Sequence, residues 1–139
     1  MFDFVVKYFG FLKHVPILPH LFEALLRLGT VASNRFVLDY MDDIENTVLS
    51  WDKTSIQPHK FGGVQFNVGN REIGHIHGNG LVDVPFKRST KEELIIESKG
   101  KVKEHHIFKK SGWISLYVQN TADKDLAIRV LMRSYEEKF

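Results

Sequence analysis

The amino-acid sequence predicts an α+β fold, a two-layer domain in which helices pack on an antiparallel sheet. Apolar residues recur at helical spacing over the first third of the chain, and from Thr54 the period changes to the alternation typical of strands. The predicted helices and strands do not alternate strictly, which disfavours a parallel sheet of the Rossmann type. For 139 residues we expect one domain over 1–139, with a helical part over 1–52 and an α+β part over 53–139.

The composition is that of an ordinary soluble protein. Hydrophobic residues make up 43% of the chain and charged residues 26%, and the net charge is +2 with neutral histidines. This charge is too small to predict nucleic-acid binding by itself. The chain has no cysteine, which excludes disulfides, thiolate nucleophiles and cysteine-ligated metals and fits a cytoplasmic location.

The start of the chain predicts an amphipathic helix over residues 2–14. Its polar face would include Asp3 and His14, and Pro16 would end it. Charged residues interrupt the apolar run, so we expect neither a membrane span nor a signal peptide. One interpretation is that this helix packs on the domain. The other is that residues 1–14 contact a membrane surface or form a homo-oligomer, which would make the protein membrane-peripheral.

Two further helices are predicted before the sheet. The first covers residues 19–28, with Glu23 on its polar stripe and Gly29 as its C-cap. The second covers residues 34–51, and its apolar residues recur at helical spacing: Val37, Tyr40, Met41, Ile44, Val48 and Trp51.

Three strands are predicted next, over residues 63–68, 71–78 and 81–86. Asn and Gly occupy both intervening pairs, residues 69–70 and 79–80, and these residue types tolerate the positive φ of tight hairpins. The sequence therefore predicts a three-stranded antiparallel meander.

The last third predicts one or two more strands and two helices. A capping box at Ser89 or Thr90 would begin the first of these helices, and Thr121 would cap the second. The elements are a helix over residues 90–98, a short strand over 105–108, a clearer strand over 113–119 and a helix over 122–137.

Histidines and glycines are concentrated between His59 and Phe86, a stretch with three of the seven histidines and six of the ten glycines. Residues two apart in a strand point the same way. Glu72 is expected on one face of its strand, and Asp83 on the next strand lies roughly opposite the histidine pair. The other face is expected to hold Arg71, Ile73, His75 and His77.

A divalent metal is the cofactor that this face indicates. Two histidines and one carboxylate, here His75, His77 and Asp83, are a recognised ligand set for zinc or non-haem iron. His59 offers an alternative third ligand. A His-x-His pair by itself is a weak motif, so metal binding is one hypothesis among several.

The same residues also fit acid-base catalysis or a structural role. His75 or His77 can act as a general base, with Asp83 or Glu72 to orient the ring. In the structural interpretation, these side chains instead form hydrogen bonds and ion pairs that stabilise the sheet. Enzymatic activity is therefore uncertain from the sequence.

A small-molecule ligand is the partner expected at this site. Arg71 offers a planar fork for a carboxylate or phosphate, and Glu72, His59 and Trp113 are the other expected ligand-binding residues. No nucleophile motif or phosphate-binding loop accompanies them.

The segment over residues 87–110 supports a second hypothesis, a surface for nucleic acid or for another protein. It holds eight Lys or Arg residues and four Glu residues, with His105, His106 and Phe108 among them. The charges are interspersed, which favours a solvated surface. Binding of nucleic acid would require one surface to be lined by Lys87, Arg88, Lys101, Lys103, Lys109 and Lys110.

The stretch that begins H-K-F-G-G and continues through R-E-I-G-H-x-H-G resembles an uncharacterised family catalogued as a luciferase-like domain, formerly a domain of unknown function. The resemblance covers residues 58–136, includes the pair His105-His106, and implies a site on these residues without naming a reaction. Its signature falls on Phe61, Gly62, Gly63, Phe66, Arg71, Glu72, Gly74, His75, His77, Gly78, Asp83, Pro85, Phe86, Trp113, Ser134 and Tyr135.

The end of the chain is also similar to the MmcQ/YjbR-like double-wing proteins, small α+β domains suspected of binding DNA. The similarity consists of Trp113 at the start of a strand, a following helix, and the pair Ser134-Tyr135. This chain departs from those proteins in its Gly-His-x-His-Gly core, which weakens any transfer of DNA binding.

Overall fold

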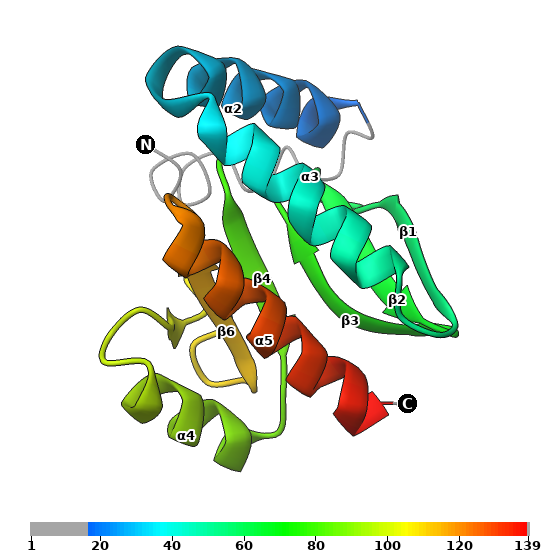
Figure 1. The fold of residues 1–139 in the computed structure, drawn as a ribbon, viewed down its shortest axis with the longest axis vertical. Coiled ribbons are helices and arrows are strands. Elements are labelled where there is room, and N and C mark those ends of the chain that lie inside the picture. Colours follow the sequence, from blue (N-terminus) through cyan, green and yellow to red (C-terminus); the bar gives the residue numbers. More distant parts are fainter. Residues whose placement is uncertain (1–16, 139) are drawn as a thin grey trace.

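The computed structural model describes residues 17–138, which form four helices and a six-stranded antiparallel sheet (Figure 1). This arrangement confirms the predicted α+β class. The elements follow in the order α2 (Leu18–Asn34), α3 (Phe36–Leu49), β1 (Thr54–Pro58), β2 (Val64–Val68), β3 (Arg71–Ile76), β4 (Leu81–Pro85), α4 (Arg88–Glu97), β5 (Lys103–Glu104), β6 (Trp113–Tyr117) and α5 (Thr121–Lys138). The helix predicted over residues 2–14 lies outside the described residues.

The sheet has the strand order β1-β2-β3-β4-β6-β5, and every neighbouring pair is antiparallel. The predicted three-stranded meander corresponds to β2, β3 and β4. Strand β1 extends this meander at one edge of the sheet. Strand β6 pairs with β4 on the other side, and β5 forms the second edge.

Helices α3 and α5 cover one face of the sheet, and α2 packs against α3 (Figure 1). The hydrophobic core lies between these two helices and the sheet. Burial of this apolar surface is the main favourable contribution to folding. Its members include Val37, Met41, Ile44 and Val48 from α3, Ala127, Val130 and Leu131 from α5, and Phe66, Ile73, Ile76, Val82, Val84, Ile114 and Leu116 from the strands.

Helix α2 is longer than predicted, because it continues through Gly29 to Asn34. A tertiary contact holds the extra turn: the Thr30 hydroxyl donates to the Gly78 carbonyl at 2.8 Å. The exposed apolar side chains of α2 include Leu21, Leu25 and Leu28. Even so, no helix within residues 17–138 combines the length and the apolar run that a membrane crossing requires.

Both predicted helix caps in the last third of the chain are wrong. Helix α4 begins at Arg88, so Thr90 lies inside it and donates from its hydroxyl to the Glu137 carboxylate at 2.9 Å. At the start of α5, the side chain of Asn120 accepts the backbone N–H of Asp123 at 3.0 Å. Asn120, and not Thr121, therefore caps this helix.

Two strand predictions also differ from the structure. Strand β1 was not predicted because it is a largely exposed edge strand, and exposure on both faces removes the alternation that marks a half-buried strand. The strand predicted over residues 105–108 is a turn instead. There, the His105 ring accepts the N–H groups of Ile107 and Phe108, and this local bonding replaces a strand ladder. The short edge strand lies just before the predicted one, at Lys103–Glu104.

Candidate metal centre

A β-bulge in β3 determines which side chains reach the site. Phe66 on β2 pairs with Gly74, but the next residue, Asn67, pairs with Glu72, so Ile73 is an extra residue on β3. Ile73 turns into the core and is fully buried. The expectation that Ile73 shares a face with His75 and that Glu72 points the opposite way is therefore wrong. The bulge shifts the alternation by one residue and brings Glu72 onto the same face as His75.

A row of polar residues crosses the sheet on the face opposite the core. Five successive cross-strand partners make up this row, and partners directly opposite each other in antiparallel strands project to the same side. They are Gln65, His75, Asp83, Ser115 and Lys103. Asp83 thus lies directly opposite His75, and the hairpin between their strands had predicted only a rough position opposite the histidine pair.

Three imidazoles converge on one oxygen of Asp83. The Oδ2 atom lies 3.4 Å from Nε2 of His75, 3.6 Å from Nε2 of His77 and 3.6 Å from Nε2 of His105. Asp83 is completely buried, and its Oδ2 accepts no hydrogen bond from the described residues. Its other oxygen, Oδ1, accepts the hydroxyl of Ser115.

Two glutamates hold the far sides of the histidine pair. Oε1 of Glu72 lies 2.7 Å from Nδ1 of His75, and Oε2 of Glu23 lies 3.4 Å from Nδ1 of His77. Glu23 comes from α2 and also accepts the backbone N–H of Gly78. Glu23 was expected only on the polar stripe of its helix, because nothing in the sequence links residue 23 to residue 77.

Helix α2 can approach the histidine pair because residue 78 is a glycine. A Cβ atom at Gly78 would lie 2.4 Å from Cγ of Arg27 and 2.7 Å from Oε1 of Glu23. Side chains do not tolerate such distances, so any other residue at this position would displace α2 or the strand end.

His105 is the second site residue that the analysis of the sequence did not assign. Its Nδ1 accepts two backbone N–H groups, from Ile107 and Phe108, each at 3.1 Å. A neutral imidazole that accepts at Nδ1 carries its proton at Nε2, and here that nitrogen faces Asp83. The pair His105-His106 in the luciferase-like resemblance was the available signal for this residue.

Of the other predicted site residues, His59 and Trp113 lie beside His75, whereas Arg71 lies on the surface. The ring of His59 stacks on His75 at 3.8 Å between centroids, and the ring of Trp113 lies 5.4 Å from His75. Nδ1 of His59 is buried without a hydrogen-bond partner among the described residues. Arg71 is exposed, and within residues 17–138 it forms no hydrogen bond or ion pair with the cluster.

The electrostatics divide the histidines into two kinds. Burial disfavours the charged form of His77, but the carboxylates of Asp83 and Glu23 outweigh this effect and raise its pKa to about 9. The pKa of His75 is raised against burial in the same way, by Asp83 and Glu72. Burial would raise the pKa of Asp83, but His75 and His77 hold it well below its usual range.

His59 and His105 are the neutral members of the cluster. Burial, followed by the charge of His75, lowers the pKa of His59 to about 4. Burial also lowers the pKa of His105 to about 4, although Asp83 acts in the opposite direction. A cationic species is therefore favoured only around His75, His77 and Asp83, and either protons or a metal ion can supply that charge.

Among residues 17–138, two groups of side chains have ligand atoms close enough to share a metal ion. In each group the ligand atoms lie within 4.8 Å of one another. The first group is His59, His75 and His77, and the second is Asp83, His105 and His106. Because Asp83 Oδ2 also lies next to His75 and His77, the two groups adjoin each other at this carboxylate.

Comparison with known proteins confirms the resemblance to the luciferase-like family. The family model described as a luciferase domain matches residues 70–134, a range that includes β3, β4 and His105. His59 and Glu23 lie outside the matched range. A search of curated proteins found no match.

The fold is similar to that of a solved structure. The crystal structure of Deinococcus radiodurans protein DR2400, with family-model domain DUF419, matches with a TM-score of 0.56 and 16% sequence identity. The match covers 68% of this chain and 75% of that one. At this identity, the similarity concerns the fold.

Proposed function

We propose that this domain binds one divalent transition-metal ion through Nε2 of His75, Nε2 of His77 and Oδ2 of Asp83, and uses it to bind or convert a small molecule. The spacing of these atoms carries the proposal. Zinc bonds of about 2.0–2.2 Å in a tetrahedron place neighbouring ligand atoms about 3.3–3.6 Å apart. Asp83 Oδ2 lies 3.4 Å and 3.6 Å from the two nitrogens.

A buried carboxylate oxygen that accepts no hydrogen bond supports a cation at this point. Buried polar atoms in folded proteins almost always have a partner, because removal from water costs free energy. Oδ2 of Asp83 accepts no hydrogen bond from the described residues, and its nearest polar neighbours are three imidazole nitrogens at 3.4–3.6 Å. A metal ion would satisfy this oxygen and both Nε2 atoms together.

The outer ring nitrogens of His75 and His77 make the carboxylate contacts that are usual for metal-binding histidines. Histidines that bind a metal commonly donate their other ring N–H to a carboxylate, which fixes the tautomer and the orientation of the ring. Glu72 occupies this position for His75, and Glu23 occupies it for His77. His105 lacks this arrangement, because its Nδ1 accepts hydrogen bonds and its protonated Nε2 faces Oδ2 of Asp83 at 3.6 Å, so we do not assign it as a metal ligand.

Three protein ligands leave a coordination position open, which is the pattern of catalytic rather than structural zinc sites. His59 has a ligand nitrogen within 4.8 Å of those of His75 and His77, and burial keeps its imidazole neutral. The same ligand set also fits non-haem ferrous iron, so zinc-assisted hydrolysis and iron-dependent oxidation are the reaction classes to screen.

The test is the metal content of the untagged protein, measured by elemental analysis after incubation with zinc, manganese or anaerobic ferrous iron. We expect one equivalent of one of these metals in the wild type. The His75→Ala/His77→Ala double variant should lose it. His20→Ala is the matched control, because His20 is an exposed histidine outside the cluster.

Asp83→Asn is a second variant for the case in which the double alanine variant loses metal because it unfolds. It keeps the shape of the side chain and removes its charge. Circular dichroism would establish that each variant is folded. A folded wild type without stoichiometric metal, or equal metal uptake by the double variant, would refute the proposal.

A further inference from the structure

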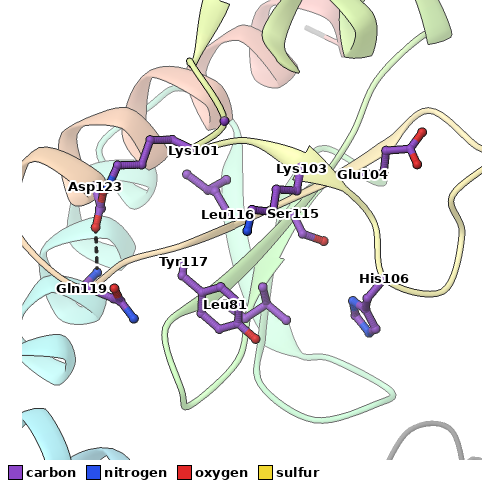
Figure 2. A pocket seen from close by; sticks show the side chains of 11 residues that line it. Leu81, Lys101, Lys103, Glu104, His106, Ser115, Leu116, Tyr117, Gln119 and Asp123 are labelled. Carbon is purple, nitrogen blue, oxygen red and sulfur yellow. Dashed lines mark hydrogen bonds and ion pairs between the residues drawn. The ribbon is translucent and has the colours of Figure 1, made fainter. Parts of the chain in front are cut away.

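Figure 2 shows a groove, of about 410 Å³, on the surface of the sheet. Ser115 and Lys103 line it and belong to the polar row that includes Asp83, so the groove lies on the same sheet face as the proposed metal ligands. It extends over β4, β5 and β6, and the residues around it include Lys103, His106, Ser115 and Tyr117. The volume falls within the range of about 300–1,000 Å³ that is usual for small-molecule sites.

Two of the lining residues connect the groove to the metal centre. The hydroxyl of Ser115 donates to Oδ1 of Asp83. A ring nitrogen of His106 lies within 4.8 Å of ligand atoms of Asp83 and His105. One end of the groove therefore adjoins the proposed metal ligands.

A positive charge lies beside Ser115 in the groove, on its cross-strand partner Lys103. Lys101 forms an ion pair with Asp123 at 2.9 Å, and Glu104 pairs with Lys91 at 3.2 Å, so these four charges are balanced. Lys103 forms no ion pair or hydrogen bond with any residue of the described range. Its ammonium group is left to attract an anion.

We infer that the groove binds a small organic anion, with a carboxylate or phosphate group on Lys103 and a second oxygen directed to the metal. The inference rests on the proposed metal centre. Lys103, Ser115 and Asp83 are successive cross-strand partners, and neighbouring strands lie about 4.8 Å apart. The Cα atoms of Lys103 and Asp83 are therefore roughly 10 Å apart, a span that suits a compact ligand.

The test is a titration of the zinc-loaded full chain followed by ¹H-¹⁵N NMR. The probes are butyrate, inorganic phosphate and butyramide, which is the uncharged counterpart of butyrate. We expect butyrate or phosphate to shift the amide signals of residues around the groove and butyramide to leave them unchanged. The relative affinities of the first two probes identify the preferred anionic group.

Two lysine variants test the assigned charge. Lys103→Gln should raise the dissociation constant of the bound anion about tenfold or more, because it removes a charge-assisted hydrogen bond. Lys87→Gln is the matched control, because Lys87 is an exposed lysine that does not line the groove. It should bind the anion as the wild type does.

The same experiment separates this inference from the proposed function. Stoichiometric zinc without anion binding, or with equal affinity in Lys103→Gln, would overturn the inference and leave the metal centre intact. Equal anion affinity with and without zinc would overturn the contact between ligand and metal. If elemental analysis found no zinc in the chain, the proposed function itself would be refuted. Elemental analysis does not depend on the titration, so the two failures can be told apart.

Discussion

At the scale of single residues, the three histidines around Asp83 differ in the group that contacts Nδ1, the ring nitrogen that faces away from Asp83. A carboxylate holds this nitrogen in His75 and in His77, whereas two backbone N–H groups hold it in His105. These outer contacts determine the protonation of the inner nitrogens. Residues that do not touch the metal should therefore influence its affinity.

Substitution of the two outer carboxylates tests this dependence. Glu72→Gln and Glu23→Gln should each weaken metal binding by about 10- to 100-fold, because each removes the acceptor that orients a ligand histidine. Competition with a chromophoric chelator measures the affinity. Glu92→Gln serves as the control, since Glu92 is exposed and forms no ion pair within the described chain. Unchanged affinity in both folded variants would contradict the assigned positioning role.

The pKa shifts predict how the stability of the metal-free protein depends on pH. His77 has a folded pKa of about 9 against an ordinary value of 6.5, so its contribution is complete below pH 6.5 and is lost as the pH rises towards 9. His59 and His105 have folded pKa values of about 4, so their contribution is present above pH 6.5 and is lost as the pH falls. These groups should therefore give a maximum of the free energy of unfolding near pH 6.5.

Zinc should change this profile, because the metal competes with protons for His75 and His77. The stabilisation by zinc should grow as the pH rises from 6 to 9, where the metal-free protein becomes less stable. Urea unfolding with and without zinc across this range measures both curves. A metal-free protein whose stability kept rising to pH 9 would contradict the assignment of His77 as cationic.

At the scale of the elements, strand and helix positions were largely predictable, but the faces of β3 were not. The Asn and Gly pairs at residues 69–70 and 79–80 correctly predicted the hairpins, and these placed Asp83 roughly opposite the histidine pair. The bulge at Ile73 reversed the expected direction of Glu72. A bulge depends on how the strand fits against its neighbours and the core, and a single sequence does not contain that information.

The approach of α2 to the site gives a prediction at this scale. Gly78→Ala would place a methyl group 2.4 Å from Cγ of Arg27, so it should destabilise the fold by about 1–3 kcal/mol and displace Glu23 from His77. Chemical denaturation measures the first effect, and zinc affinity measures the second.

Gly29→Ala is the matched control in the same helix. A Cβ atom at Gly29 would meet nothing within 4 Å, and alanine favours a helix interior. This variant should be more stable than the wild type by about 0.5–1 kcal/mol, with unchanged zinc affinity. Equal behaviour of the two alanine variants would show that the close contact at Gly78 is unimportant.

At the scale of the whole molecule, the sequence predicted the α+β class and most residues of the cluster, but it did not predict how the cluster is assembled. His75, His77 and Asp83 are close in sequence, so local strand geometry sufficed to group them. Glu23 and His105 come from distant segments, and their positions depend on the packing of α2 and on a turn after β5.

An assembled centre of this kind should link metal binding to global stability. A metal that binds the folded chain alone, at a free concentration 100 times its dissociation constant, adds about 2.7 kcal/mol to the free energy of unfolding. Urea denaturation of the wild type and of His20→Ala should show this increase with zinc. The His75→Ala/His77→Ala variant should show none, and an equal increase there would place the metal elsewhere.

The two edge strands have a consequence for how the chain behaves at high concentration. An open sheet exposes unpaired backbone groups that can recruit strands from other molecules. Here β5 has only two residues, both charged, and β1 ends in a proline. Short, charged or proline-containing edges oppose strand addition, so both borders of this sheet are protected against edge-to-edge aggregation.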